Sequence, residues 1–269
     1  MQDYKMPIRE QYSNKGTFGK VLNIAGSNNY IGAAYLSTYS ALKIGAGYVA
    51  LASCKNVIKS VSQKLPEAVY MELPYAYRKL NEFTVVLIGC GIGQSFLAKQ
   101  NLKKVIKFLK NKETPLVIDA DGLNALSKIR NIDLPQNTIL TPHPAEAARL
   151  LGITVEEVLN NLEYSAKNLV EKYNCTIVLK THRTIICNKD NLYINKHGNS
   201  SLAKAGTGDV LAGIIAGLFA QKMTPFECAR LGVYLHSRAG EIASEELTEY
   251  SVMASDIPKY LPFAIKEIL

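Results

Sequence analysis

The residues Ala205-Gly206-Thr207-Gly208-Asp209 lead directly into an apolar segment of helix-forming composition, residues 210–220. Two glycines within three residues let the backbone approach a ligand closely and adopt angles that other residues resist. The unpaired N–H groups of the first helical turn, together with the helix dipole, form a site for an anion. This stretch therefore predicts that a phosphate binds where the helix begins.

Asp209 is the unexpected residue at this site, because its carboxylate would repel a phosphate. One interpretation makes Asp209 the N-cap of the helix, a position that favours Asp. The other makes it a base, which takes the proton of a hydroxyl group as that hydroxyl attacks the phosphate held by the glycines. The residue alone leaves both interpretations open.

Length and charge narrow the class of protein. The 269 residues come near the upper size for one hydrophobic core, so we expect a single α/β domain over residues 1–269. The net charge of +8 suggests a nucleic-acid partner, but the densest lysines, within residues 103–112, recur at the near-helical spacing of a solvated helix face. Tryptophan is absent and the tyrosines are dispersed, so no aromatic stacking platform is evident. We expect anionic small molecules as ligands and no nucleic acid.

The cysteines and the N-terminus predict a cytoplasmic protein. The five cysteines are odd in number and form no CxxC pair, which is typical of reduced thiols. The first ten residues are too charged for the apolar part of a signal peptide. No apolar run reaches the roughly 18 residues that a membrane span needs, so we expect no membrane partner.

Strand-like and helix-like segments alternate along the chain. We predict strands at residues 21–25, 48–53, 68–73, 84–88, 116–119, 138–141 and 176–180, followed by a hairpin of residues 183–188 and 192–195. We predict helices at residues 33–44, 95–110, 146–151, 162–173, 210–221 and 225–247, a short one from residue 123, and another in the C-terminal tail. This alternation predicts an α/β fold, with a mostly parallel central sheet and helices on both faces.

Chemically distinctive residues follow the ends of these strands, where such sheets bind ligands. They are Gly26, the glycines of GCGIG (residues 89–93), Asp119, Asp121, His143, Glu146 and Lys180. The glycine motif has GxGxG rather than GxGxxG spacing, and no acidic residue ends a strand about 20 positions later. This pattern argues against a standard Rossmann dehydrogenase.

Several of these residues have a structural interpretation beside a functional one. Asp119 and Asp121 are either metal ligands, or a helix cap and a turn residue. Lys180 either extends its ammonium group to solvent or reaches a phosphate. His143 lies between two prolines and is either an ordinary loop residue or a ring aimed at a ligand; the neighbouring Glu146 favours the second.

Taken together, the motifs resemble those of the ADP/ATP-dependent NAD(P)H-hydrate dehydratase family, in the ribokinase-like superfamily. The resemblance is carried by Gly26-Ser27, Gly32-Ala33, GCGIG (residues 89–93), DADGLNAL (residues 119–126), TPHPAE (residues 141–146), Val178-Leu179-Lys180 and AGTGDV (residues 205–210). These occur in the family's order across about residues 19–260. The resemblance implies a ribokinase-like fold and a stand-alone form without the epimerase domain that many relatives carry.

The resemblance also implies an activity, the repair of NADH or NADPH whose nicotinamide ring carries a hydroxyl group at position 6. In this family a nucleotide phosphorylates the hydroxyl, and the phosphate then leaves. Asp209 matches the family's base and hydrate contact. The other implied contacts of the hydrate are Ala33, Gly91, Gly93 and His143.

The implied co-substrate is ADP or ATP, with Mg²⁺ as cofactor. The implied contacts of the nucleotide and its phosphates are Lys180, Thr181, His182, Arg183, Thr184, Gly206, Thr207 and Gly208. Glu146 is the implied magnesium residue, acting through water, since Mg²⁺ keeps much of its hydration. The family usually has glycine where this chain has Thr181, which puts the detailed nucleotide contact in question.

Two other functions stay open. A ribokinase-like kinase of a hydroxylated vitamin precursor would share the fold and the base, but related kinases carry Asn where this chain has His143. A nucleotide-binding regulatory module without turnover would not need a base such as Asp209. The resemblance further implies a homo-oligomer, which we predict to be a tetramer.

Overall fold

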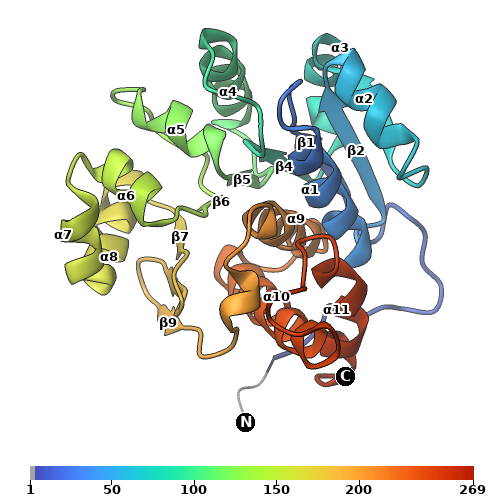
Figure 1. Ribbon diagram of the computed structural model, residues 1–269. Coiled ribbons are helices and arrows are strands. Elements are labelled where there is room, and N and C mark those ends of the chain that lie inside the picture. The colour runs from blue at the N-terminus through green and yellow to red at the C-terminus, as the bar shows by residue number, and fades with distance from the viewer. Residues whose placement is uncertain (1–3) are drawn as a thin grey trace.

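The computed structural model describes residues 4–269, which form one nine-stranded sheet between two layers of helices (Figure 1). The strands are β1 (Lys20–Ile24), β2 (Tyr48–Ser53), β3 (Val69–Glu72), β4 (Val85–Ile88), β5 (Leu116–Ile118), β6 (Thr138–Leu140), β7 (Thr176–Leu179), β8 (Ile185–Cys187) and β9 (Leu192–Ile194). Their order in the sheet is β3-β2-β1-β4-β5-β6-β7-β8-β9. Pairing is parallel from β3 to β7 and antiparallel from β7 to β9, as the predicted hairpin requires.

Helices bury both faces of the sheet in separate cores. One core contains α1 (Ile31–Lys43), α2 (Lys55–Ser62), α9 (Thr207–Ala220), α10 (Pro225–Leu247) and α11 (Ile257–Lys266). The other contains α3 (Leu73–Arg78), α4 (Phe96–Leu109), α5 (Asp121–Ser127), α6 (Pro144–Leu151), α7 (Val155–Asn160) and α8 (Leu162–Tyr173). Within residues 4–269, none of these helices has the length and apolar character to cross a membrane.

The strands serve both cores because successive side chains of a strand point to opposite faces. Val85 and Leu87 of β4 belong to the first core, whereas Val86 and Ile88 belong to the second. All four side chains are fully buried. This explains why the central strands read as continuous apolar runs in the sequence.

The strand order changes direction at β1, and this determines where a ligand can bind. The chain runs from β1 through β2 to β3, and then continues on the other side of β1 from β4 to β7. The carboxyl ends of β1 and β4 therefore meet at a topological switch point, the usual place for a ligand in such sheets. The Gly26 N–H donates to the Cys90 carbonyl oxygen at 2.8 Å and joins the two loops there.

Helix α9 packs closely against α1 through glycines. A Cβ atom on Gly213 would lie 2.2 Å from the carbonyl oxygen of Ser37, and one on Gly217 would lie 2.3 Å from Cγ2 of Ile44. Nearly every side chain of α9 is buried, so it forms the centre of its core. The apolar run after the glycine motif is therefore a core helix whose first turn is held rigidly by its neighbours.

We expect Gly213→Ala to lower the free energy of unfolding by about 1–3 kcal/mol, because the added methyl group would overlap the backbone of α1. Gly32→Ala in α1 is the matched control, since a Cβ atom there meets nothing within 4 Å. Denaturant unfolding of both variants measures the difference. Equal stability of Gly213→Ala and wild type would contradict the close packing of α1 and α9.

The predicted strands are confirmed to within two residues at each end, and the predicted parallel sheet with helices on both faces is confirmed. Helix α9 begins three residues earlier than predicted, at Thr207. Helices α2, α3 and α7 were not predicted from the sequence. Helices α2 and α3 have no side-chain cap, which removes the usual local signal for a helix start.

Candidate active site

Helix α9 begins at the phosphate motif, and its N-cap is Gly206 rather than Asp209. Gly206 has φ of +94°, in the left-handed region that favours glycine, and a Cβ atom there would lie 2.6 Å from Cδ1 of Leu36. Asp209 is the third residue of the helix, and its side chain makes no capping hydrogen bond. The N-cap interpretation of Asp209 is therefore wrong, and its carboxyl group is available for chemistry.

His236 of α10 fixes the first turn of α9 from the side. Its Nε2 lies 3.0 Å from the carbonyl oxygen of Thr207 and donates to it. Burial lowers the pKa of His236 to about 4, so the ring is neutral at physiological pH. The neutral ring therefore holds the anion-binding turn without adding a charge of its own.

Asp209, which is partly buried, lies in a cluster with the buried side chains of Cys90 and Asp119. One ligand atom from each of the three side chains lies within 4.8 Å of the other two. Burial, and after it the charge of Asp119, raise the pKa of Asp209 to about 7, against the opposing effects of Cys90 and Lys180. A carboxyl group with this pKa is suited to take a proton from a hydroxyl group and to release it again near pH 7.

We expect Asp209→Asn to raise the free energy of unfolding at pH 8 by on the order of 2–4 kcal/mol. The pKa of Asp209 rises from 3.8 to about 7 on folding, so its protonated form is favoured in the folded protein. Its contribution to stability is complete below about pH 4 and is lost as the pH rises through about 7. The amide stays neutral throughout, so the variant avoids this loss.

Denaturant unfolding of wild type and Asp209→Asn from pH 4 to pH 8 tests this expectation. The difference in stability should be near zero at pH 4 and grow steadily toward pH 8. A variant no more stable than wild type at pH 8 would show that Asp209 is not buried as described.

The Lys180 ammonium group pairs with Asp119 instead of extending to solvent. Its Nζ lies 2.7 Å from Oδ1 of Asp119 and 3.9 Å from Oε2 of Glu146, and the Lys180 side chain is 18% exposed. Burial lowers the pKa of Lys180, but the two carboxylates outweigh burial and the net pKa is raised. A Cβ atom on Gly208 would lie 3.4 Å from this Nζ. The solvent-extended interpretation is wrong, because the charge lies beside the start of α9.

Asp119 and Asp121 have separate structural partners. Oδ1 of Asp119 accepts hydrogen bonds from Thr141 Oγ1 at 2.6 Å and from Lys180, and the N-cap of α5 is the following residue. The cap interpretation of Asp119 is therefore wrong. Asp121 begins α5, and its carboxylate accepts a hydrogen bond from the Gly93 N–H at 2.8 Å. Asp121 thus holds the glycine loop after β4.

The glycine loop packs against the start of α1. A Cβ atom on Gly91 would lie 2.8 Å from Cβ of Ala33, and φ of Gly91 is +64°. Ser27 Oγ donates to the Gly91 carbonyl oxygen at 2.9 Å. The structure therefore brings together Ala33 and Gly91, two residues predicted to contact the hydrate, while Gly93 is tied to α5.

His143 and Glu146 form a capping box at the start of α6. Nδ1 of His143 accepts from the N–H groups of Ala145 and Glu146, and Glu146 Oε2 accepts from the His143 N–H at 2.9 Å. Burial lowers the pKa of His143, and the charges of Lys180 and Arg149 lower it further. The ring is half-exposed, so His143 both caps a helix and presents a neutral imidazole at the strand ends.

A cavity of about 660 Å³ collects most of the predicted nucleotide contacts. Its lining includes Lys180, Thr181, His182, Arg183, Thr184, Thr207 and Gly208 on one part, and residues 195–200, 202 and 203 on another. No acidic residue lines it, so its charged side chains are all cationic. Of the predicted nucleotide contacts, only Gly206 lies outside the lining. Size and charge both suit an anionic ligand of nucleotide class.

The carboxyl groups near this cavity fit a hydrated divalent cation. Asp119, Asp209 and Glu146 are buried near one ammonium group, that of Lys180, and burial raises the pKa of Glu146 to about 7. Such an excess of carboxylate oxygens suits Mg²⁺. Glu146 Oε2 already accepts from the His143 N–H and faces Lys180. A contact through water therefore fits Glu146 better than direct ligation.

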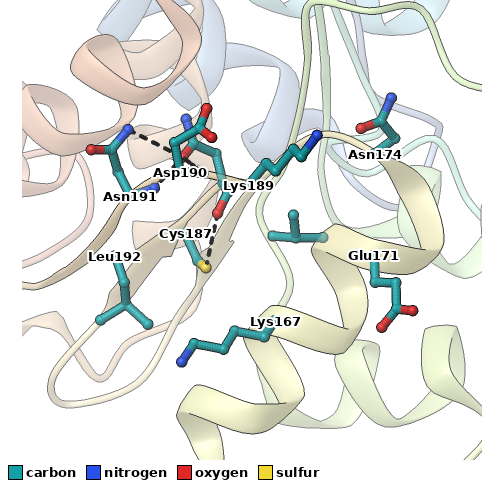
Figure 2. Close-up of a pocket in the computed structure, with 10 residues that line it drawn as sticks. Lys167, Glu171, Asn174, Cys187, Lys189, Asp190, Asn191 and Leu192 are labelled. Atoms are coloured by element: carbon teal, nitrogen blue, oxygen red, sulfur yellow. Dashed lines mark hydrogen bonds between the residues drawn. The ribbon is translucent and has the colours of Figure 1, made fainter.

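A second cavity, of about 610 Å³, lies between α8 and the β8–β9 hairpin (Figure 2). Its lining is Lys167, Val170, Glu171, Asn174, Cys187, Asn188, Lys189, Asp190, Asn191 and Leu192. None of the predicted site residues lines this cavity, and its two lysines are offset by two acidic residues. The predicted site residues at the carboxyl ends of the strands lie outside this second cavity, so we assign no ligand to it.

Sequence reasoning missed three residues of the candidate site. Thr141 was visible only as part of the TPHPAE motif, and Cys90 only as the variable position of the glycine motif. His236 lies inside the 23-residue helix α10, where a single histidine gives no signal. Each acts on a residue far away in the sequence, which local patterns do not reveal.

The sequence is similar to that of a known protein family. A family model described as NAD(P)H-hydrate dehydratase matches residues 21–263. An ADP-dependent (S)-NAD(P)H-hydrate dehydratase of Neisseria meningitidis serogroup B is 36% identical over 243 residues, which cover 88% of this chain and 81% of that protein. A bifunctional NAD(P)H-hydrate repair enzyme Nnr of Thermofilum pendens is 36% identical over 98% of this chain but only 53% of its own length. The chain therefore spans about half the length of such bifunctional relatives.

The fold is similar to that of solved structures. The Bacillus subtilis ADP/ATP-dependent NAD(P)H-hydrate dehydratase, co-crystallised with ATP/Mg²⁺, superposes with a TM-score of 0.88 at 31% identity. The match covers 98% of this chain and 95% of that one. A ribokinase-like superfamily protein of Enterococcus faecalis V583 gives a TM-score of 0.89 at 32% identity, over 98% of this chain and 92% of that one. The predicted ribokinase-like fold class is confirmed by these similarities.

Proposed function

Because the chain belongs to the NAD(P)H-hydrate dehydratase family, we propose that it is a carbon–oxygen lyase that uses ADP or ATP to return hydrated NADH or NADPH to the reduced dinucleotide. The observation that carries this proposal is the partly buried carboxyl group of Asp209, with a pKa near 7 at the start of α9. Gly208, the preceding residue, lines the cationic cavity. The base and the place for the phosphates are thus adjacent in the chain.

Asp209 would take the proton of the ring hydroxyl as that oxygen bonds to the terminal phosphorus atom of the nucleotide. The bond between this phosphorus and the bridging oxygen breaks in the same step, which leaves AMP from ADP or ADP from ATP. The ring C–O bond then breaks, and the phosphate leaves with the electron pair as the ring nitrogen supplies electrons. Loss of a proton from the adjacent ring carbon restores the double bond of the reduced nicotinamide.

The phosphates would lie between the start of α9 and Lys180. The N–H groups of the first helical turn and the Lys180 ammonium group both present positive charge, so the negative phosphates would be bound from two sides. Thr181 stands where the family usually has glycine. Its hydroxyl group closes a turn with Arg183: it donates to the Arg183 carbonyl oxygen at 2.8 Å and accepts from the Arg183 N–H at 3.2 Å. This turn supports the proposed nucleotide contact of residues 180–184 despite the substitution.

Mg²⁺, bound with the nucleotide, would offset the charge of the transferred phosphate. Glu146 would hold a water molecule of its hydration shell, as its buried position beside Lys180 suggests. His143, Ala33, Gly91 and Gly93 would contact the hydrated dinucleotide near the ends of β4 and β6. The neutral imidazole of His143 can exchange hydrogen bonds with the substrate without a second positive charge.

The direct test is the recovery of reduced-nicotinamide absorbance from purified NADH hydrate, with Mg²⁺ and either ADP or ATP. We expect recovery with nucleotide and none without it, or after removal of Mg²⁺ by a chelator. Nucleic acid, membranes and other proteins are not needed in this assay. Folded protein that gives no recovery with either nucleotide would overturn the proposed function.

We also propose that the protein is cytoplasmic, which is consistent with five cysteines that are all free thiols. The tetramer implied by the family stays a prediction. Light scattering of the purified protein would measure its mass in solution.

A further inference from the structure

One wall of the nucleotide cavity, residues 195–199, is attached to a polar stripe of α10. Ser237, Glu241 and Ser244 are four and three residues apart, so they lie on one face of the helix. Each bonds the wall: Asn195 Nδ2 donates to Ser237 Oγ at 2.9 Å, the Gly198 N–H to Glu241 Oε1 at 2.5 Å, and Asn199 Nδ2 to Ser244 Oγ at 2.7 Å. The position of the wall therefore depends on α10.

Glu241 is the only charged member of this stripe and makes the most contacts. Its Oε2 lies 3.7 Å from Nδ1 of His197 and 3.0 Å from Nη1 of Arg238. The Glu241 side chain is 21% exposed and does not itself line the cavity, whereas His197 and Gly198 do. A hydrogen bond from a backbone N–H to a carboxylate is stronger than one between neutral groups.

The bond to Gly198 matters because this residue has an unusual backbone conformation. Its φ is +104°, in the region that favours glycine, and a Cβ atom there would lie 3.1 Å from Cδ1 of Leu202, another lining residue. The ring of His197 contacts Tyr234 of α10 edge-on, with ring centroids 4.9 Å apart. The Glu241 carboxylate thus contacts two successive residues of the cavity wall.

We propose that Glu241 is a positioning residue for the nucleotide: through His197 and Gly198 it keeps the cavity wall in the conformation that binds ADP or ATP. This inference rests on the proposed function, which places the nucleotide in this cavity. Without the carboxylate, the Gly198 N–H loses its hydrogen-bond partner. A smaller fraction of the protein molecules then has the cavity wall in the conformation that binds nucleotide. The apparent Kd of the nucleotide then rises in inverse proportion to that fraction.

The experiment compares Glu241→Ala, Glu241→Gln and Glu245→Ala with wild type. Calorimetry gives the Kd of ADP with Mg²⁺, and hydrate repair gives KM for ADP and kcat. Glu241→Ala should raise Kd and KM about tenfold while kcat stays within about twofold of wild type. Glu241→Gln keeps an oxygen that accepts from the Gly198 N–H, so its Kd should stay within about threefold of wild type.

Glu245→Ala is the matched control, because Glu245 also pairs with Arg238, at 3.6 Å, but is 68% exposed on its side chain. Its Kd should equal that of wild type. An unchanged Kd in Glu241→Ala, or an equal rise in Glu245→Ala, would overturn the positioning role, and a lower melting temperature alone would not support it. Wild type that binds neither ADP nor ATP would overturn both proposals. Wild type that binds nucleotide but repairs hydrate with neither ADP nor ATP would overturn the proposed function alone.

Discussion

Asp209→Asn is expected to lower kcat for hydrate repair by about 10²- to 10⁴-fold, the usual contribution of a general base. The amide has nearly the shape of the carboxyl group but cannot accept the proton of the attacking hydroxyl. The helix start and Lys180 remain in place, so the Kd of ADP should change little. Rates at saturating hydrate and nucleotide, together with calorimetric binding of ADP, separate the two effects.

Asp121→Asn is the control for this variant. Asp121 lies on the neighbouring α5, and its role is to accept a hydrogen bond from the Gly93 N–H, which an amide oxygen also accepts. We expect it to keep most of the activity. If Asp209→Asn kept more than about a tenth of wild-type kcat, Asp209 would not be the base.

Lys180→Met is expected to lower the free energy of unfolding at pH 8 by about 3–5 kcal/mol and to abolish nucleotide-dependent repair. The substitution keeps the volume of the side chain but leaves the carboxylates of Asp119 and Glu146 without their ammonium partner. The charge of Lys180 lowers the pKa of Glu146, which burial otherwise raises, so its removal raises that pKa further. The loss of stability should therefore shrink as the pH falls from 8 to 5.

The double variant Lys180→Met with Asp119→Asn separates stability from function. Removal of one unpaired carboxylate should restore part of the lost stability, since fewer buried charges lack a partner. Activity should not return, because the phosphates still lack the ammonium group. If Lys180→Met were as stable as wild type and bound ADP equally well, the ion pair of Lys180 with Asp119 would contribute neither to stability nor to nucleotide binding.

The sequence predicted the sheet well because its signals are local. The apolar runs of β1, β4 and β7 end in glycine or charged residues, which indicate strand ends without knowledge of the fold. The convergence of the functional residues also follows from this pattern, since parallel strands end at the same edge. Helix α7 was missed despite a usable signal, the capping box formed by Thr154 and Glu157.

The partners within the site could not be predicted, because they are far apart in the sequence. Lys180 and Asp119 are 61 residues apart, and only the order of β5, β6 and β7 brings them to 2.7 Å. The pKa of Asp209 near 7 likewise depends on burial and on Asp119, which no local pattern encodes. The Asp209 residue type therefore suggested both a cap and a base. The identity of the N-cap, Gly206, excludes the cap, and the base remains a proposal.

The fate of the transferred phosphate distinguishes the proposed lyase from a kinase. Phosphorus NMR and absorbance would follow one reaction of NADH hydrate with ADP and Mg²⁺. The proposed lyase predicts inorganic phosphate, AMP and NADH in equal amounts. A stable phosphate ester without recovery of NADH would contradict this account and identify a kinase instead.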